Sequence, residues 1–552
     1  DLKYADAIVP SPDGAWVAFT ELHNAYIAAF PKTGSPIELS KDTKAIPVKQ
    51  VSRDAGLYVH WSADSQRLHW VLGPEYFSRD LSDSFSFVAG APDTLPAIDS
   101  TGVAIGLTAR TDAPTGRLAF TGARIITMNG DEVIENGVLV VEGNRIVAVG
   151  PAGGVQVPAG ATVIGASGTT IMPGLVDVHA HVSHFFDGPS PQQNWAYMAN
   201  LAFGVTTLHD PSANTSFVFS QSELVKAGGT VGPRVYSTGT ILYGADGDFK
   251  AVINSLDDAR SHLRRMKAVG AFSVKSYNQP RREQRQQVLQ AARELEMMVV
   301  PEGGSTLYHN LTMIVDGHTG IEHNIPVAPL YNDVMSVWAE TKVGYTPTLV
   351  VNYGGPSGEY YWYQHDSVWD NDRLLRFYPR SALDARARRP TIVPDDEYFH
   401  MEVSRSAKAL VDRGGRVQLG AHGQLQGLAA HWELWMFAQG GMTNHEVLRA
   451  GTLFGAEYLG LDGDIGSLEA GKLADLVVLD ANPLDDIRNT ETIRLVMVNG
   501  RLFDAATMNE VGNHPRERKP FYWQTDGLDD TFIWADDALG LPFGPVCSCG
   551  RH

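Results

Sequence analysis

The sequence predicts an α/β protein in which a TIM barrel is combined with a split β-sandwich domain and an N-terminal segment resembling part of a β-propeller. Three observations predict this fold: short strands with turn sequences fill the start of the chain, strand-rich segments bracket its middle, and the middle alternates strands with helices. The chain of 552 residues is also too long for one ordinary domain, since domains usually have roughly 100–200 residues.

Residues 1–112 carry the propeller-like pattern. A polar turn at 11–14 precedes alternating apolar residues at 15–19, and a second turn at 62–65 precedes a similar run at 66–70. The recurrence indicates a repeat of the size of a propeller blade. Because a closed propeller needs about four blades or more, we expect the rest of it to come from the same precursor or from another chain. A small β-sandwich extension is the alternative.

The split β-domain is predicted from residues 117–172 together with 456–512. Strand patterns occur at 119–127, 137–150, 474–480 and 496–501, and the second of these is a hairpin turned by Glu142-Gly143-Asn144. These strand-rich segments lie on both sides of the middle of the chain, so we expect them to form one composite domain.

Residues 513–552 form a C-terminal tail with the only two cysteines of the chain, Cys547 and Cys549. Two cysteines exclude a disulfide framework, and no thiolate is available for a metal site in the body of the chain. Together with His552 the two cysteines resemble a metal site, but at a chain end we expect a disordered or disulfide-paired tail.

Residues 173–455 are predicted to form the barrel. Short apolar strands are expected at 205–208, 273–275, 298–300 and 417–420, with helices between them such as 281–296. This alternation favours a parallel sheet, and a TIM barrel is the natural closure at this length.

The charge and hydropathy of the chain exclude two kinds of partner. The net charge of −19 argues against nucleic acid, which requires a basic surface. No stretch of about 18 apolar residues is present, so we expect no membrane span. No signal peptide is visible, but the chain starts at Asp1 without a methionine, and the compartment therefore stays open.

The segment 171–181, Ile-Met-Pro-Gly-Leu-Val-Asp-Val-His-Ala-His, carries the clearest chemical signal. On a strand, residues i and i+2 point to the same side, so His179 and His181 are expected to lie side by side. Two imidazoles at the carboxyl end of a barrel strand bind a divalent ion well, and that end is where TIM-barrel active sites lie.

With its flanking Pro-Gly-Leu-Val-Asp, this segment resembles the first barrel strand of the amidohydrolase superfamily, in the subgroup of imidazolonepropionase-like and prolidase-like enzymes. Further motifs resemble the family in the same order along the chain, and the resemblance covers residues 117–505: Gly-Val-Thr-Thr and Asp210 in 203–210, Gly-Pro-Arg in 232–235, Ile-Glu-His in 321–324 and the return segment 465–477. The turns near the N-terminus resemble TolB-like propeller blades, which occur fused to amidohydrolases. That likeness favours a periplasmic or secreted location, with a cytoplasmic one as the alternative.

The resemblance implies further ligands. His323 stands at a metal-binding position of the family, and Lys275 stands where the family carries a lysine carboxylated by CO₂ that bridges two metals. Two positions depart from the pattern: Glu302 replaces a histidine at the end of the fifth strand, and His422 replaces the aspartate at the end of the eighth. A carboxylate is an acceptable zinc ligand, and a histidine serves either as ligand or as base.

These residues predict a metal-dependent hydrolase that cleaves a C–N bond in an amide, peptide or cyclic amide with metal-activated water. Zinc is expected, or another divalent transition metal, as one or two ions. His422 is the expected base, and Lys275 is expected to act with it. We expect a small-molecule or short-peptide substrate and a homo-oligomer, and the candidate substrate-binding residues are Tyr243, Tyr277, Tyr353 and His184. A non-hydrolytic isomerase on the same metal site and a non-catalytic binding protein are the alternatives.

Overall fold

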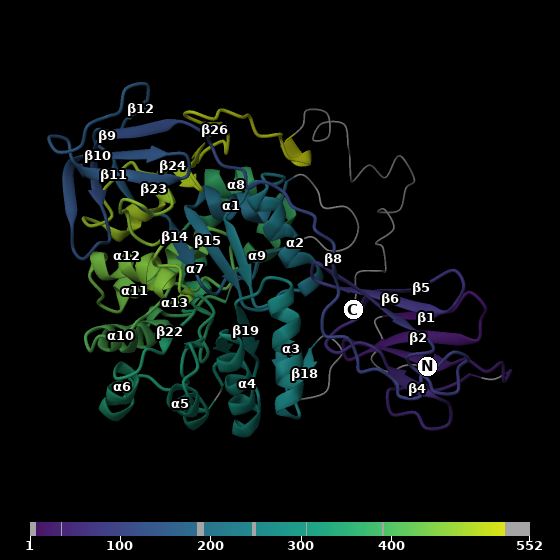
Figure 1. The fold of residues 1–552 in the computed structure, drawn as a ribbon. Helices are drawn as coiled ribbons and strands as arrows, with labels where there is room; N and C mark the ends of the chain where they lie inside the picture. Colours follow the sequence, from purple (N-terminus) through teal and green to yellow (C-terminus); the bar gives the residue numbers. More distant parts are fainter. Residues whose placement is uncertain are drawn as a thin grey trace, which may run out of the picture.

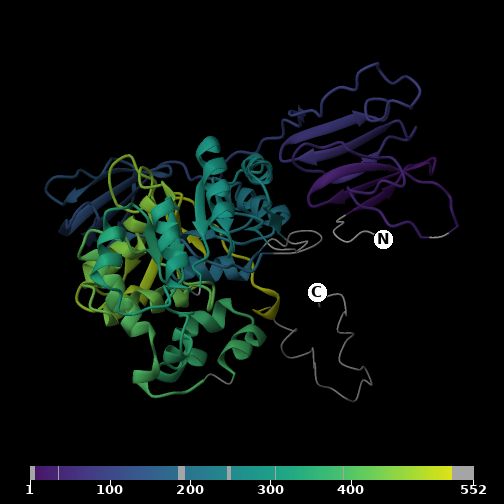
Figure 2. The same ribbon diagram turned by 90° about the horizontal axis from the view of Figure 1, so that it is seen from below.

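The computed structural model describes residues 7–34, 36–184, 193–244, 250–304, 306–388 and 391–524. The chain has a mixed α/β fold, with a large body of strands and helices and a pair of small sheets at its side, formed by the N-terminal part of the chain (Figures 1 and 2). Cys547, Cys549 and His552 lie outside the described residues. Within the described residues, no helix is both long and apolar enough to cross a membrane.

The N-terminal part contains two four-stranded antiparallel sheets, each with its strands in sequence order. The first consists of β1 (Ile8–Pro10), β2 (Trp16–Glu21), β3 (Asn24–Ala29) and β4 (Val48–Gln50), and the second of β5 (Leu57–Trp61), β6 (Arg67–Leu72), β7 (Glu75–Asp80) and β8 (Val103–Ala104).

The two turns singled out in the sequence have the same hydrogen bonds. In the first, the Asp13 carboxylate accepts from the Ser11 hydroxyl and the Ala15 N–H, and in the second, Asp64 accepts from Ser62 and the Gln66 N–H. Each of the two sheets therefore has the same turn between its first two strands.

The N-terminal sheets contact the main body at α3 (Leu256–Ala268), which lies beside them in Figure 1. Asp54, only 3% exposed, accepts from the Arg264 guanidinium at 2.6 and 2.9 Å, and its carbonyl accepts from Arg265 at 2.7 Å. Burial raises the pKa of the Asp54 carboxyl, but Arg264 and Arg53 outweigh burial and hold it below its ordinary value. Asp54 is thus the electrostatic centre of this junction.

We expect Asp54→Ala to lower the free energy of unfolding by about 2–3 kcal/mol, since hydrogen bonds to charged groups contribute about 1.5–3 kcal/mol each. The folded-state pKa of Asp54 is depressed, so its stabilisation is complete above the unfolded pKa of about 3.9 and is lost as the pH falls below it. Urea unfolding at pH 7 and at pH 3 measures both effects. Asp42→Ala, which removes a carboxylate with 75% of its side chain exposed, should change neither value.

A nine-stranded sheet joins two distant parts of the chain. It contains β9 (Arg117–Ile126), β10 (Val133–Glu142), β11 (Arg145–Pro151), β12 (Thr162–Gly165), β13 (Thr170–Pro173), β23 (Leu476–Leu479), β24 (Ile493–Val498), β25 (Arg501–Asp504) and β26 (Glu510–Val511). The junction is the antiparallel pair β13–β23, in which Thr170 lies opposite Leu479. Leu139, Ile171 and Val478 belong to the apolar core on one of its faces. The segment that leads into the His-x-His motif is thereby held at the centre of this sheet.

The strands in the middle of the chain pair in parallel throughout the part that the structure describes. These are β14 (Leu175–Asp177), β15 (Val205–Asp210), β16 (Arg234–Ser237), β17 (Leu242–Tyr243), β18 (Ala251–Val252), β19 (Ser273–Ser276), β20 (Met298–Pro301), β21 (Gly320–Glu322) and β22 (Gly344–Thr346). Parallel bridges join Glu302 to Glu322 and Tyr345 to Val417. The Val178 N–H donates to the Leu419 carbonyl, so the series returns to the end of β14.

Helices alternate with these strands and lie around them (Figure 1). They are α1 (Trp195–Ala202), α2 (Thr215–Lys226), α3, α4 (Arg282–Leu295), α5 (Leu307–Asp316), α6 (Asn332–Ala339), α7 (Gly358–His365), α8 (Asp372–Phe377), α9 (Arg380–Ala387), α10 (His400–Val411), α11 (Leu428–Gln439), α12 (Asn444–Gly451) and α13 (Leu453–Leu459).

The predicted strands at 205–208, 273–275 and 298–300 correspond to β15, β19 and β20, and the predicted helix at 281–296 to α4. The segment 417–420 differs, because only Val417 forms a bridge there. His179 and His181 also differ, because they follow the end of β14 and do not lie on it.

Candidate metal centre

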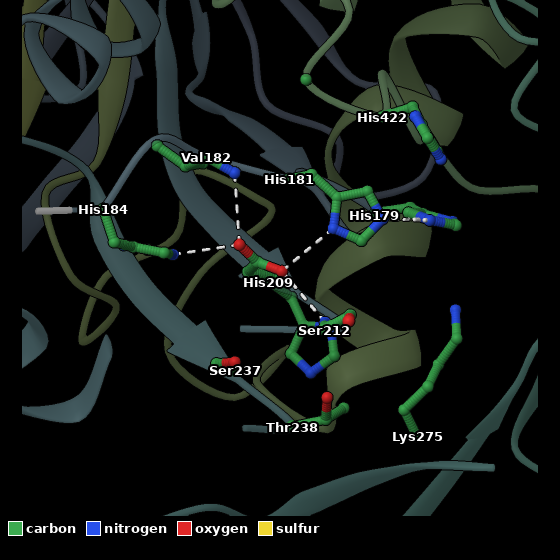
Figure 3. A network of polar contacts seen from close by, with 12 residues as sticks. His179, His181, Val182, His184, His209, Ser212, Ser237, Thr238, Lys275 and His422 are labelled. Carbon is green, nitrogen blue, oxygen red and sulfur yellow. Dashed lines mark hydrogen bonds and ion pairs between the residues drawn. The ribbon is translucent and has the colours of Figure 1, made fainter. Parts of the chain in front are cut away.

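Three histidines from the two ends of the parallel series meet in one place. Ligand atoms of His179, His181 and His422 all lie within 4.8 Å of one another. The Nε2 atoms of His179 and His181 are 3.2 Å apart, and Figure 3 shows the His422 ring beside both. Two nitrogens bound to one tetrahedral zinc at about 2.05 Å lie about 3.4 Å apart, so this spacing suits a shared ion.

Backbone hydrogen bonds hold the three histidines together. The buried Asp177 carboxylate accepts the N–H groups of His179 and Ala421 at 3.1 and 3.2 Å, in place of strand partners. The His422 N–H donates to the His179 carbonyl at 2.7 Å. This contact requires an unusual backbone: His422 has φ 57°, and a Cβ on the following Gly423 (φ 69°) would lie 1.8 Å from the His181 carbonyl oxygen. Only glycine fits there.

Asp210, the last residue of β15, orients His181. Its Oδ1 lies 3.2 Å from His181 Nδ1, and its Oδ2 lies 3.0 Å from His184 Nε2 and accepts the Val182 N–H. Burial raises the pKa of this carboxyl, but His181 and His184 outweigh burial and hold it well below its ordinary value. A carboxylate behind a ligand histidine fixes the ring tautomer, so His181 presents Nε2 to the centre.

A second cluster of predicted site residues surrounds Lys275. The Lys275 Nζ lies 2.7 Å from Glu302 Oε2 and also donates a short hydrogen bond to Glu322. The other oxygen of Glu302 is 3.0 Å from His323 Nε2 and accepts from the Tyr353 hydroxyl at 3.0 Å. The His323 ring lies 4.8 Å from the His179 ring, so this cluster adjoins the three histidines.

Burial favours the neutral form of His179, His422 and the neighbouring His323. Burial, with Lys275 nearby, lowers the pKa of His179 well below its ordinary value, and burial lowers that of His422 to about 3. Burial also lowers the pKa of His323, although Glu302 opposes the shift. Neutral imidazoles have the free lone pair that metal binding requires.

The carboxyl groups near Lys275 differ from each other. Burial raises the pKa of Glu302, but Lys275 and His323 outweigh burial and hold it well below its ordinary value. Burial raises the pKa of Glu322 to about 7. Burial alone would lower the pKa of Lys275, but Glu302 and Glu322 raise it above its ordinary value, which favours an ammonium group.

The residues fit a divalent cation. The donors are imidazole nitrogens and carboxylate oxygens, which suit zinc and similar ions. Two buried atoms beside the centre, His323 Nδ1 and Glu322 Oε1, have no hydrogen-bond partner among the residues that the structure describes. The two facing lone pairs of His179 and His181 would repel each other unless a proton or a cation lay between them.

The predicted substrate-binding residues lie in three places. Tyr353 contacts the centre: its ring stacks on His323 at 4.6 Å, and its hydroxyl holds Glu302. Tyr243 and Tyr277 contact each other edge to face at 5.8 Å, and Tyr243 lies at the end of β17. His184 is buried behind Asp210, where it also bonds the Tyr197 hydroxyl at 2.7 Å.

Two carboxylates of the site, Asp210 and Glu322, received no role from the sequence. Each closes an apolar strand, β15 and β21, and each is fully buried. A buried charge in an apolar strand is costly without a partner. The same argument applied to Glu322 would have identified it.

Comparison with known proteins gives matches of fold and of family. The solved structures that resemble the chain include a Xaa-Pro dipeptidase with bound methionine (20% identity, 70% of this chain and 100% of that one, TM-score 0.54). Others are ochratoxinase of A. niger (18%, 71% and 96%, TM-score 0.53) and molinate hydrolase (18%, 74% and 99%, TM-score 0.55). At these identities the likeness is one of fold.

Two sequence matches complete the comparison. The 5'-deoxyadenosine deaminase of Methanobrevibacter smithii is 54% identical over 41 residues, which is 7% of this chain and 9% of that enzyme. The sequence profile described as "Amidohydrolase family" matches residues 170–503, more than half of the chain. The chain therefore belongs to the amidohydrolase family.

Proposed function

We propose that the protein is a metal-dependent amidohydrolase that uses water to cleave a C–N bond in a small amide, a short peptide or a cyclic amide. The observation that carries the proposal is the meeting of His179, His181 and His422, with ligand atoms within 4.8 Å of one another, in a chain of the amidohydrolase family. The resemblance of the fold to a dipeptidase, an ochratoxinase and a molinate hydrolase supports the reaction class.

The three histidines are the proposed holders of the metal, with zinc as the expected ion. A divalent ion held there would lower the pKa of a bound water toward about 7 and polarise the scissile carbonyl. His422 is assigned to the metal because it belongs to the three-histidine group, and Nε2 is its available ring nitrogen, since its Nδ1 lies 3.1 Å from Gln424 Oε1.

Lys275 is proposed to stabilise negative charge in the site. In Figure 3 its amine points toward the histidines, and the contacts with Glu302 and Glu322 keep it charged. A fixed cation in a buried site stabilises negative charge that develops on a carbonyl oxygen. The carboxylated lysine that the family resemblance implies would instead set a third anion beside two carboxylates, so we favour one metal ion and an uncarboxylated lysine.

Tyr353 and Glu302 are proposed to bind the substrate. The Glu302 carboxylate is held by Tyr353 and His323 on one oxygen and by Lys275 on the other. An ionised carboxylate beside the centre suits a substrate with an amine or N–H group next to the bond that is cleaved. A dipeptide or an N-terminal amino acid amide has such a group.

The proposed architecture is that of the sequence prediction. We propose a TIM barrel over residues 173–455, supported by its parallel pairings and by the hydrogen bond from Val178 to Leu419. The nine-stranded sheet supports a composite domain of 117–172 and 456–512. The two sheets with their repeated turn support TolB-like propeller blades in residues 1–112.

The test is hydrolysis of a panel of dipeptides, N-acyl amino acids and cyclic amides in ¹⁸O-labelled water. We expect one ¹⁸O atom in the new carboxyl group, loss of activity after chelation and recovery on addition of Zn²⁺. Product without label would indicate the non-hydrolytic alternative. Less than about one equivalent of metal on the folded protein would indicate the binding-protein alternative.

A further inference from the structure

Behind His422 lies a short chain of hydrogen bonds that leads away from the metal centre. His422 Nδ1 is 3.1 Å from Gln424 Oε1, and Gln424 Nε2 is 2.7 Å from Glu359 Oε1. Glu359 is only 6% exposed and comes from α7, which is far from His422 in the sequence. Through these contacts a buried carboxylate acts on one ring nitrogen of His422, a proposed metal ligand.

The direction of these hydrogen bonds follows from the chemistry of the groups. An ionised carboxylate only accepts hydrogen bonds, so Glu359 must face the amide nitrogen of Gln424. The Gln424 oxygen then faces His422 and accepts from Nδ1–H. A neutral imidazole has one N–H, so Nε2 of His422 carries the free lone pair.

Several groups favour the ionised form of Glu359. Arg386 Nη1 lies 3.9 Å from its Oε2, and the carboxylate lies in the first turn of α7, where the helix dipole favours negative charge. The backbone N–H of Glu359 donates to the Val350 carbonyl at 2.8 Å, which fixes where the side chain starts. Burial raises the pKa of the carboxyl above its ordinary value, although Arg386 and Gln424 oppose that shift.

We propose that Glu359 and Gln424 are positioning residues that hold His422 as its Nδ1–H tautomer and thereby present Nε2 to the metal. The metal-binding part of this inference rests on the function proposed above, while the tautomer can be measured without metal. Gln424 reaches the centre through His422 Nδ1, and Glu359 acts on His422 through Gln424. The relay plays for His422 the part that Asp210 plays for His181, through an amide in place of a direct carboxylate.

The test combines two single variants with a double variant. Glu359→Gln removes the charge that orients the amide, so Gln424 becomes free to turn over. Gln424→Met keeps a similar volume and removes both hydrogen bonds. In Glu359→Gln with Gln424→Glu, the new carboxylate accepts from Nδ1–H and the new amide donates to it, so the relay is restored with its charge moved. Glu340→Gln, at the exposed C-cap of α6, is the matched control.

The first measurement is ¹⁵N NMR of the His422 ring in the metal-free protein, assigned by comparison with His422→Gln. We expect the Nδ1–H tautomer in the wild type, the control and the double variant, and a mixture of tautomers in both single variants. The second measurement is competition titration with Zn²⁺ alone. We expect affinity to fall about 10–100-fold in the single variants, as for other groups that orient metal ligands, and to recover in the double variant.

The relay would be refuted by an Nε2–H tautomer in the metal-free wild type, or by single variants with wild-type tautomer and zinc affinity. If the double variant were as weak as the single ones, a packing role would explain the loss instead. If the wild type bound no Zn²⁺, the proposed function would fail, and the tautomer of the metal-free variants would still decide the relay. Thermal melts of each variant show whether it is folded.

Discussion

His179→Ala is expected to abolish stoichiometric zinc binding and to lower the rate of hydrolysis by about 10³-fold, because a metal contributes several kcal/mol to the transition state and each 1.36 kcal/mol is tenfold. His179 is fully buried, its Nε2 faces His181 at 3.2 Å, and its carbonyl anchors the His422 N–H at 2.7 Å. The variant keeps that carbonyl, so the turn around His422 should persist while the shared ligand is lost. Metal analysis of the purified variant and kcat/KM on the best substrate of the panel measure the two effects.

The matched control is His365→Ala, which removes a histidine at the end of α7 with 37% of its side chain exposed. It should keep one equivalent of zinc and full activity. If His179→Ala retained both as well, the three-histidine centre would be wrong and another set of ligands would have to hold the metal.

Lys275→Met is expected to lower the free energy of unfolding of the metal-free protein by about 3–5 kcal/mol, since removing one partner of a buried ion pair leaves an uncompensated charge. Lys275 is 1% exposed and lies between Glu302 and Glu322. Methionine fills a similar volume, so the loss reflects the missing charge and not a cavity. Urea unfolding in the presence of a chelator gives the value.

Two further variants separate charge from chemistry at this position. Lys275→Arg keeps a cation and should recover part of the lost stability, although arginine cannot be carboxylated. Glu322→Gln in the Lys275→Met background removes one stranded carboxyl group and should also recover part of it. Stability of Lys275→Met equal to that of the wild type would show that the lysine is not the counter-ion of these carboxylates.

Much of the fold could be predicted from the sequence, because it depends on local patterns of apolar and polar residues. The apolar run that forms β15 and the helix pattern that forms α4 each produce an element by their own periodicity. The segment 417–420 was harder to predict, because its backbone groups form hydrogen bonds with residues that are distant in the sequence. These hydrogen bonds replace a regular strand ladder. There the Asp177 carboxylate accepts the Ala421 N–H, a contact that no local pattern predicts.

The site could be predicted where a residue type was unexpected among its neighbours in the sequence. His179 and His181 stood out as histidines at the end of an apolar strand, and Lys275 stood out through the family resemblance. The structure brings the three into one region, since His179 and Lys275 both lie beside Glu322. The partners that orient them were harder to find. Gln424 and Glu359 are ordinary polar residues in sequence, and only the packing of α7 against the turn after Ala421 makes them neighbours.

The nine-stranded sheet has a consequence for how the polypeptide is made. Its central pair, β13 and β23, joins residues about three hundred positions apart, and β13 leads directly into the segment with His179. During synthesis on a ribosome, β13 therefore has no partner strand along one of its edges until β23 has emerged. Contacts so distant along the chain slow folding and expose unpaired strands to aggregation. Such a nascent chain would benefit from binding by chaperones until its last strands have been synthesised.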